Sequence, residues 1–266
     1  MYLELMKRCL TREAFPERYR SLTTAGWKGR LTRRPQRALE AAGLALVRTM
    51  RWDREARAEG TDWPAEAETM IGRQRLDHLH GCITQVLADG VPGDLIETGV
   101  WRGGAVILMR AVLAAHGATD RTVWVADSFC GLPPPDPGAF PADAGDTLWK
   151  HSRLAIGLEE VKANFSRYQL LDRQVQFLPG WFRDTLPSAP IEQLAVMRLD
   201  GDLYESTTVA LEALYPKLSV GGYVIVDDYG SLEPCRRAVH DYRDQHDAGE
   251  EIVPVDGAAI YWRREA

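Results

Sequence analysis

Four aspartates stand directly after two short apolar runs in the second half of the chain: Asp200, Asp202, Asp227 and Asp228. The runs cover residues 196–199 and 222–226, and residues 205–218 between them have the composition of one helix. This order predicts a β-α-β unit, whose two parallel strands end at the same edge of a sheet. Because open α/β sheets bind their ligands at that edge, we expect the four carboxylates to converge in one cleft.

Converging carboxylates repel one another unless a cation lies among them or some of them are protonated. Oxygen ligands of this kind suit a hard cation such as Mg²⁺. The alternative is that acids at strand ends cap helices and face water, and this would be our reading of a single aspartate. For an Asp-x-Asp pair and an Asp-Asp pair on neighbouring strands, we favour a metal site.

A glycine-containing turn carries the second motif, Glu97-Thr-Gly-Val-Trp-Arg-Gly-Gly104. It follows a short predicted strand, residues 94–99, and opens a predicted helix, residues 105–115. Gly99 would allow a tight turn, and Gly103 and Gly104 would let a ligand or the sheet approach the helix start. The spacing is not that of the Gly-x-Gly-x-x-Gly dinucleotide motif. Glu97 would repel a pyrophosphate and attract an ammonium group, although such turns often serve packing alone.

Two further strand ends could contact a nucleoside. A second predicted strand, residues 122–127, ends in Asp127, the position at which α/β nucleotide-binding proteins hold ribose hydroxyls. Asp127 could equally be a capping residue. A third predicted strand, residues 175–180, is followed by Trp181 and Phe182, where a base could stack, although packing in the core explains these aromatics as well.

The remaining elements complete an α/β domain. Residues 131–157 are rich in Pro, Asp and Gly, and a loop of this length is either disordered or functional, commonly a lid. Near the C-terminus, Asp256-Gly257 between two β runs predicts a hairpin, so the last strand should run antiparallel to an otherwise parallel sheet. That ending separates S-adenosylmethionine methyltransferases from Rossmann-type dehydrogenases. Residues 69–266 would form this domain.

Residues 1–68 show no strand alternation, and we expect a helical N-terminal extension. Between residues 28 and 57, nine Lys/Arg stand against three acids. Such a basic segment could meet an acidic partner, but it more often forms the solvated side of a helix or a subunit contact.

Composition excludes several classes of protein. The chain has 266 residues, 45% of them hydrophobic, a net charge of −6 and a pI near 5.6, which argues against general nucleic-acid binding. Four widely spaced cysteines without a Cys-x-x-Cys pair indicate reduced thiols in a cytoplasm rather than disulfides or zinc ligands. We see neither a signal peptide nor an apolar run that could span a membrane.

Several motifs in the same order resemble the macrocin O-methyltransferase family. They are the Glu97–Gly104 turn, Val125-Ala-Asp-Ser-Phe129 with Gly131-Leu-Pro, Leu199-Asp-Gly-Asp-Leu-Tyr204 and Val226-Asp-Asp-Tyr229. Lys7-Arg-Cys-Leu-Thr11, Asp62-Trp-Pro64 and Thr69-Met-Ile-Gly72 match too, so the resemblance covers nearly the whole chain.

The resemblance implies a class I S-adenosylmethionine methyltransferase (Rossmann-like) fold, Mg²⁺ dependence, a homodimer or larger homo-oligomer, and a glycosylated antibiotic as small-molecule acceptor. By position, Asp200, Asp227 and Asp228 would bind the metal and Asp202 would be the general base. The acceptor would be chosen by the variable lid. The expected S-adenosylmethionine site comprises Glu97, Thr98, Gly99, Gly103, Asp127, Ser128, Gly180, Trp181, Phe182 and Met70.

Other readings stay open at this point. A catechol-type phenol O-methyltransferase shares a three-acid metal site. A lysine near the metal would favour that reading, but the residues after Asp202 are Leu203 and Tyr204. A metal-dependent hydrolase would leave Glu97 and Asp127 without a role. A non-catalytic nucleotide-binding module would not need Asp202.

Overall fold

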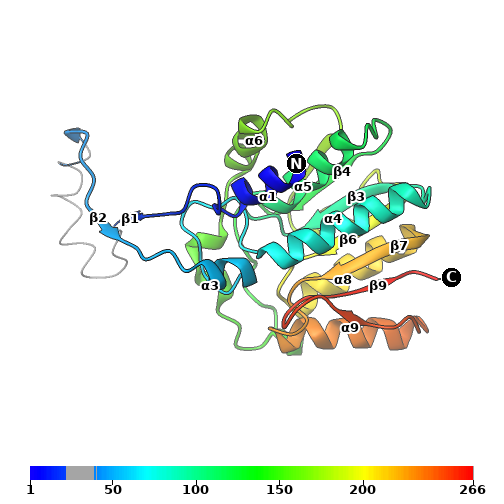
Figure 1. Cartoon of the computed structure of the whole chain (residues 1–266). Helices are drawn as coiled ribbons and strands as arrows, with labels where there is room; N and C mark the ends of the chain where they lie inside the picture. Colours follow the sequence, from blue (N-terminus) through cyan, green and yellow to red (C-terminus); the bar gives the residue numbers. More distant parts are fainter. Residues whose placement is uncertain (22–38, 40, 266) are drawn as a thin grey trace.

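A seven-stranded mixed sheet forms the centre of the computed structural model, which describes residues 1–21, 39 and 41–265 (Figure 1). In spatial order the strands are β5 (Val175–Pro179), β4 (Val123–Asp127), β3 (Asp94–Thr98), β6 (Leu194–Leu199), β7 (Leu218–Val226), β9 (Ile260–Arg263) and β8 (Val253–Pro254). The first five are parallel, and β9 runs antiparallel to both β7 and β8, which confirms the predicted hairpin. The strand order reverses between β3 and β6, and a binding crevice opens at such a switch point.

Helices cover both faces of the sheet. One face packs against α1 (Tyr2–Leu10), α4 (Arg73–Ala88), α5 (Gly104–Ala115) and α6 (Leu158–Arg167). The other packs against α8 (Tyr204–Leu214), α9 (Glu233–Gln245) and the short α7 (Phe182–Thr185). Successive strand residues serve opposite cores, as Leu95 and Ile96 do, because side chains alternate across a strand.

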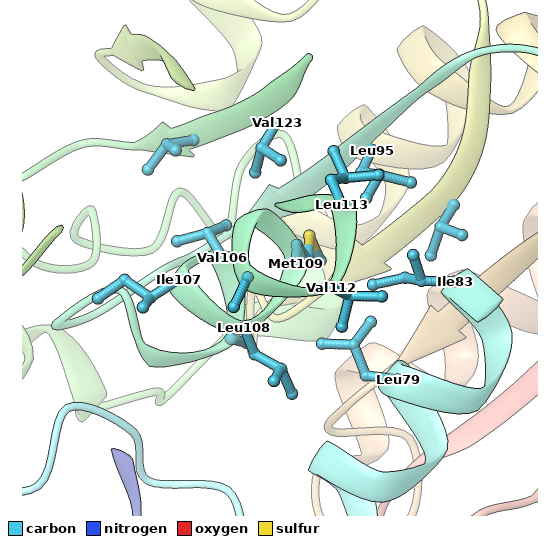
Figure 2. Packing of buried hydrophobic residues seen from close by; sticks show 14 of the residues in the cluster. Leu79, Ile83, Leu95, Val106, Ile107, Leu108, Met109, Val112, Leu113 and Val123 are labelled. Atoms are coloured by element: carbon cyan, nitrogen blue, oxygen red, sulfur yellow. The ribbon is translucent and has the colours of Figure 1, made fainter. Parts of the chain in front are cut away.

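Helix α5 is apolar apart from Arg110, which pairs with Asp172 at 2.5 Å, and every residue from Gly104 to Leu113 is buried. Figure 2 shows why: its side chains fill the space between Leu95 and Val123 of the sheet and Leu79 and Ile83 of α4. A helix that is hydrophobic all round is stable only where it is enclosed. The helix that follows the glycine turn is therefore held rigidly at the centre of the fold.

The N-terminal region differs from the helical extension predicted. It contains α1 and α3 (Arg54–Glu59), but also a two-stranded antiparallel ribbon of β1 (Tyr19–Ser21) and β2 (Val47–Thr49), which lies away from the body of the molecule (Figure 1). Strands of three residues are too short to show alternation, and β2 has no buried face to impose one. The domain boundary at residue 68 stays a prediction.

The basic segment is only partly described. Its residues 28, 30, 33, 34 and 37 lie outside the described residues. Arg48, Arg51 and Arg54 are exposed, as predicted for a solvated face. Arg57 is buried instead, pairs with Asp62 at 3.1 Å, and donates hydrogen bonds to backbone carbonyls of residues 69–71.

Two other elements are shorter or more structured than expected. The helix predicted over residues 205–218 ends at Leu214, and a 3₁₀ turn that contains Pro216, η4 (Tyr215–Lys217), precedes β7. The loop expected to be a lid, residues 131–157, contains three 3₁₀ turns: η1 (Pro141–Asp143), η2 (Leu148–Lys150) and η3 (Ser152–Leu154). Among the described helices, none has the length and apolar character needed to cross a membrane.

Candidate active site

The glycine turn brings the ends of β3 and β6 into direct contact. Gly99 has a φ of +81°, and a Cβ atom there would lie 1.7 Å from the carbonyl oxygen of Asp200. Only glycine fits this position, so the predicted tight turn is confirmed. The neighbours of Gly103 and Gly104 are Val161 and residues 68–69, so chain segments occupy the space where a ligand or the sheet was expected.

A cleft of about 760 Å³, counting its open mouth, lies at the carboxyl ends of β3, β4, β5 and β6. Of the residues predicted from the sequence, those that line the cleft are Met70, Gly99, Asp127, Ser128, Gly180, Trp181, Phe182, Asp200 and Asp202. Those that do not line it are Glu97, Thr98, Gly103, Asp227 and Asp228.

Sequence reasoning missed part of the lining. Trp101, within the glycine motif, lines the cleft with a left-handed backbone, φ 48°. Glu205, Ser206 and Val209 line it from one face of α8, and their helical spacing directly after the Asp-Gly-Asp motif was a usable signal. Arg183 also lines the cleft and pairs with Glu205 at 2.9 Å, but no pattern in the sequence pointed to it.

Asp127 holds loop amides and also lines the cleft, which is compatible with both roles left open by the sequence. Its Oδ2 accepts a hydrogen bond from the backbone N–H of Val100 at 2.8 Å, and its Oδ1 accepts one from that of Phe129 at 2.7 Å. These bonds join the ends of β3 and β4. Burial raises the pKa of Asp127, and the amide hydrogen bonds act against that rise. Since Asp127 also lines the cleft, it retains acceptor capacity toward a ligand.

Three aspartates form a cluster: Asp200, Asp202 and Asp228 each offer a carboxylate oxygen, and these oxygens lie within 4.8 Å of one another. We call these three residues the aspartate cluster. The backbone N–H of Asp202 donates to Oδ2 of Asp228 at 3.2 Å, and Asp202 has a left-handed backbone with φ 60°. Burial, reinforced by the neighbouring negative charges, raises the pKa of all three carboxyl groups.

Asp227 faces two arginines instead of joining the cluster. Arg198, buried on β6, donates to Asp227 and Glu97 and to Oδ2 of Asp200 at 2.9 Å. Arg75, on α4, bridges Asp227 at 2.7 Å and Asp256 of the C-terminal hairpin at 2.6 Å. The sequence analysis identified neither arginine, because their partners come from distant parts of the chain.

Glu97 lies beneath the cleft and is 2% exposed. Burial raises its pKa to about 8, while the adjacent Arg198 acts to lower it and the charges of Asp200 and Asp227 add to the rise. Its Oε1 pairs with Arg198, and its buried Oε2 has no hydrogen-bond partner among the described residues. A buried acceptor without a partner costs free energy, so a donor arriving from the cleft side would be favourable there.

The charges of this network do not balance. Six carboxylates (Glu97, Asp200, Asp202, Asp227, Asp228 and Asp256) surround two guanidinium groups, Arg75 and Arg198. If all were ionised, four negative charges would be in excess, and like charges held together at a partly buried site repel unless protons or a cation bind among them. The donor set is oxygen alone, which fits a hard divalent cation.

Residues 1–264 match the family model described as macrocin-O-methyltransferase (TylF). The chain is 58% identical over 215 residues, 80% of its length and 82% of the relative's, to 8-demethyl-8-(2,3-dimethoxy-alpha-L-rhamnosyl)-tetracenomycin-C 4'-O-methyltransferase of Streptomyces olivaceus. It is 56% identical over 79% of its length to demethyldecarbamoylnovobiocin O-methyltransferase of Streptomyces niveus, covering 80% of that protein. It is 51% identical over 87% of its length to mycinamicin III 3''-O-methyltransferase of Micromonospora griseorubida, covering 91% of that protein.

Solved structures agree. The structure of the O-methyltransferase NovP superposes with a TM-score of 0.86 at 47% identity, covering 100% of this chain and 98% of that one. Calicheamicin methyltransferase CalS11 has a TM-score of 0.58 at 20% identity, covering 90% of this chain and 94% of that one, and so shares the fold.

Proposed function

Because the chain belongs to the macrocin-O-methyltransferase (TylF) family and is an O-methyltransferase of the class I fold, we propose that it methylates a sugar hydroxyl of a glycosylated natural product, with S-adenosylmethionine as the methyl donor. The names of three relatives support this acceptor class, since they refer to a rhamnosylated tetracenomycin, a novobiocin precursor and mycinamicin III. The observation that carries the proposal is that Asp127 and two members of the aspartate cluster line one cleft.

In this proposal the cofactor lies along the ends of β3, β4 and β5. Asp127 would accept hydrogen bonds from the ribose hydroxyls, and Trp181 and Phe182 would contact the adenine. The partnerless Oε2 of Glu97 would accept from the ammonium group of the methionine part. Met70, whose backbone carbonyl is held by Arg57, would close the same end of the cleft. The cofactor would supply the methyl group as a sulfonium, so the residues here need only hold geometry and exclude water.

We assign Mg²⁺ to the carboxylates at the ends of β6 and β7, with Asp200, Asp227 and Asp228 as ligands. Asp227 would share its oxygens between the ion and its two arginines. When bound, the ion would lower the pKa of an acceptor hydroxyl. Asp202 would accept the proton from that hydroxyl, because it lines the cleft and Asp228 does not.

The proximity of Asp202 to Asp200 and Asp228 supports a competing assignment, in which Asp202 is a ligand. The two assignments make opposite predictions, developed in the Discussion.

The N-terminal ribbon supports the proposal of a homodimer or larger homo-oligomer. Several large apolar side chains in or beside it are exposed: Phe15, Tyr19, Leu44, Leu46 and Val47. Where such exposed apolar side chains form one patch, they commonly mark a protein contact.

Four free cysteines fit a reducing cytoplasm as the site of action.

Two measurements test the proposal. Calorimetric titration with S-adenosylmethionine in excess chelator should show binding, because the proposed cofactor contacts are distinct from the aspartate cluster. Methyl transfer should then be assayed on demethyldecarbamoylnovobiocin, mycinamicin III and a set of catechols, with Mg²⁺ or with chelator. Transfer to a glycoside only with Mg²⁺ is the expected result. Transfer to catechols alone would favour a phenol methyltransferase, and failure to bind S-adenosylmethionine would reject the proposal.

A further inference from the structure

Helix α8 begins two residues after Asp202, and its N-cap residue, Leu203, has no side chain that could cap it. The first backbone N–H groups of a helix have no partner within the helix and are normally satisfied by a polar side chain next to them. Here those of Tyr204 and Glu205 would be left without a partner at the edge of the cleft. The chain must supply an acceptor from elsewhere.

The acceptor comes from the lid. Asp143, in η1, is 1% exposed, and its Oδ1 and Oδ2 accept hydrogen bonds from the N–H groups of Tyr204 at 2.7 Å and Glu205 at 3.0 Å. A carboxylate at this position also interacts favourably with the helix dipole. The rings of Phe140 and Tyr204 lie 6.3 Å apart beside these bonds. The lid is thus fastened to α8 by a buried carboxylate.

The same contact reaches the aspartate turn. Residues 200–203 connect β6 to α8, and Asp202 holds a left-handed backbone there. The N–H of Leu203 donates to the carbonyl of Gly201 at 2.6 Å, so the turn leads directly into the residues that Asp143 holds. Within the lid, the N–H of Asp146 donates to the backbone carbonyl of Asp143 at 3.1 Å, so the residue that holds α8 is also bonded to the lid residues that follow it.

We propose that Asp143 is a positioning residue, whose carboxylate joins the lid to the first turn of α8 and thereby holds the Asp202 turn and the acceptor side of the cleft in one arrangement. This rests on the proposed function in one respect, namely that the acceptor reaches Asp202 beneath the lid. Asp143 does not line the cleft, so in this proposal it would touch neither cofactor nor acceptor. Its loss should weaken acceptor binding and slow transfer without changing cofactor binding.

Hydrogen exchange of the full chain with S-adenosylmethionine bound tests directly whether Asp143 joins the lid to the first turn of α8. In Asp143→Ala, amides in residues 131–157 and 200–206 should both exchange on the order of tenfold faster, the usual effect of losing a helix cap. Asp143→Asn keeps one acceptor oxygen, so its exchange rates should lie between those of the parent protein and those of Asp143→Ala. Asp136→Ala is the matched control, because exposed Asp136 caps only the lid's own turn through Gly138 and Ala139. Faster exchange in the lid alone would overturn the proposal, since the carboxylate would then not hold the turn.

Kinetics on an accepted glycoside separate positioning from simple stabilisation. Asp143→Ala should raise the KM for the acceptor and lower kcat, each by roughly tenfold, with the KM for S-adenosylmethionine unchanged and partial recovery in Asp143→Asn. Unchanged acceptor kinetics would overturn the proposal. If the parent enzyme methylates no glycoside, the proposed function fails, whereas the exchange experiment still decides whether Asp143 holds the turn.

Discussion

Replacing Asp202 by Asn should abolish proton transfer and leave the metal site in place. The amide keeps the shape of the side chain and can still form hydrogen bonds, but it cannot accept a proton at neutral pH. We expect Mg²⁺ affinity within a few-fold of the parent and a rate lower by roughly 10²–10⁴, the usual contribution of a general base. Extra Mg²⁺ should not restore the rate.

The geometry of the aspartate cluster sets how sharp this test is. An Mg²⁺–oxygen bond is about 2.1 Å long, so two oxygens on opposite sides of one ion lie about 4.2 Å apart. The cluster oxygens lie within 4.8 Å of one another, so each of the three carboxylates could reach a shared ion after a small shift. Distance alone therefore does not separate ligand from base. Loss of a true ligand should lower the affinity for Mg²⁺ by at least roughly 10–100-fold, the loss that is typical when an outer-shell partner of a metal ligand is removed.

The assay compares four variants by metal titration and by turnover at increasing Mg²⁺. Asp200→Ala, Asp227→Ala and Asp228→Ala serve as ligand controls, and each should bind Mg²⁺ more weakly and regain some activity at high Mg²⁺ by mass action. Should Asp202→Asn lose the metal and recover turnover at high Mg²⁺, then Asp202 is a ligand and the base must be sought elsewhere. Should Asp227→Ala bind Mg²⁺ normally, then Asp227 serves its two arginines alone.

Three further predictions concern the cofactor, pH and assembly. Asp127→Ala should lower the affinity for S-adenosylmethionine by roughly 10- to 150-fold, because the lost hydrogen bonds to a charged group contribute ~1.5–3 kcal/mol. Unchanged affinity in calorimetry would refute the ribose assignment. Without metal, the raised pKa values of the aspartate cluster mean that the folded state holds more protons than the unfolded state above pH ~4. The free energy of unfolding should therefore fall as pH rises toward 8, and Mg²⁺ should reduce that fall. A melting temperature in chelator that does not fall over this range would contradict it. Deleting residues 1–58 should change the oligomeric mass or the acceptor affinity in light scattering and kinetic assays; native mass with full activity would show that the segment serves neither role.

Local patterns in the sequence were enough to predict the architecture of the domain and the edge of the sheet at which the cleft lies. Strand and helix periodicity placed β3, α5, β6 and β7 within a few residues, and the Asp256-Gly257 turn predicted the antiparallel end of the sheet. Because parallel strands end at one edge, the aspartates after β6 and β7 could be expected near one another without any structure, and Asp200, Asp202 and Asp228 do form a cluster, whereas Asp227 does not join it. Gly99 was identified for the same local reason, since only glycine permits that turn.

Only the tertiary structure decided how the charges are partnered. Asp227 meets Arg75 across 152 positions of sequence, and Asp143 caps α8 across 61 and 62 positions. Neither partner could be predicted. A buried carboxylate requires a hydrogen-bond donor, but the sequence around it does not show which distant element provides that donor. The ribbon of β1 and β2 escaped prediction for a related reason: an exposed strand of three residues has no buried face, so its side chains need not alternate. Periodicity therefore determined the fold and the edge that carries the site, while long-range pairing determined which carboxylates remain available for chemistry.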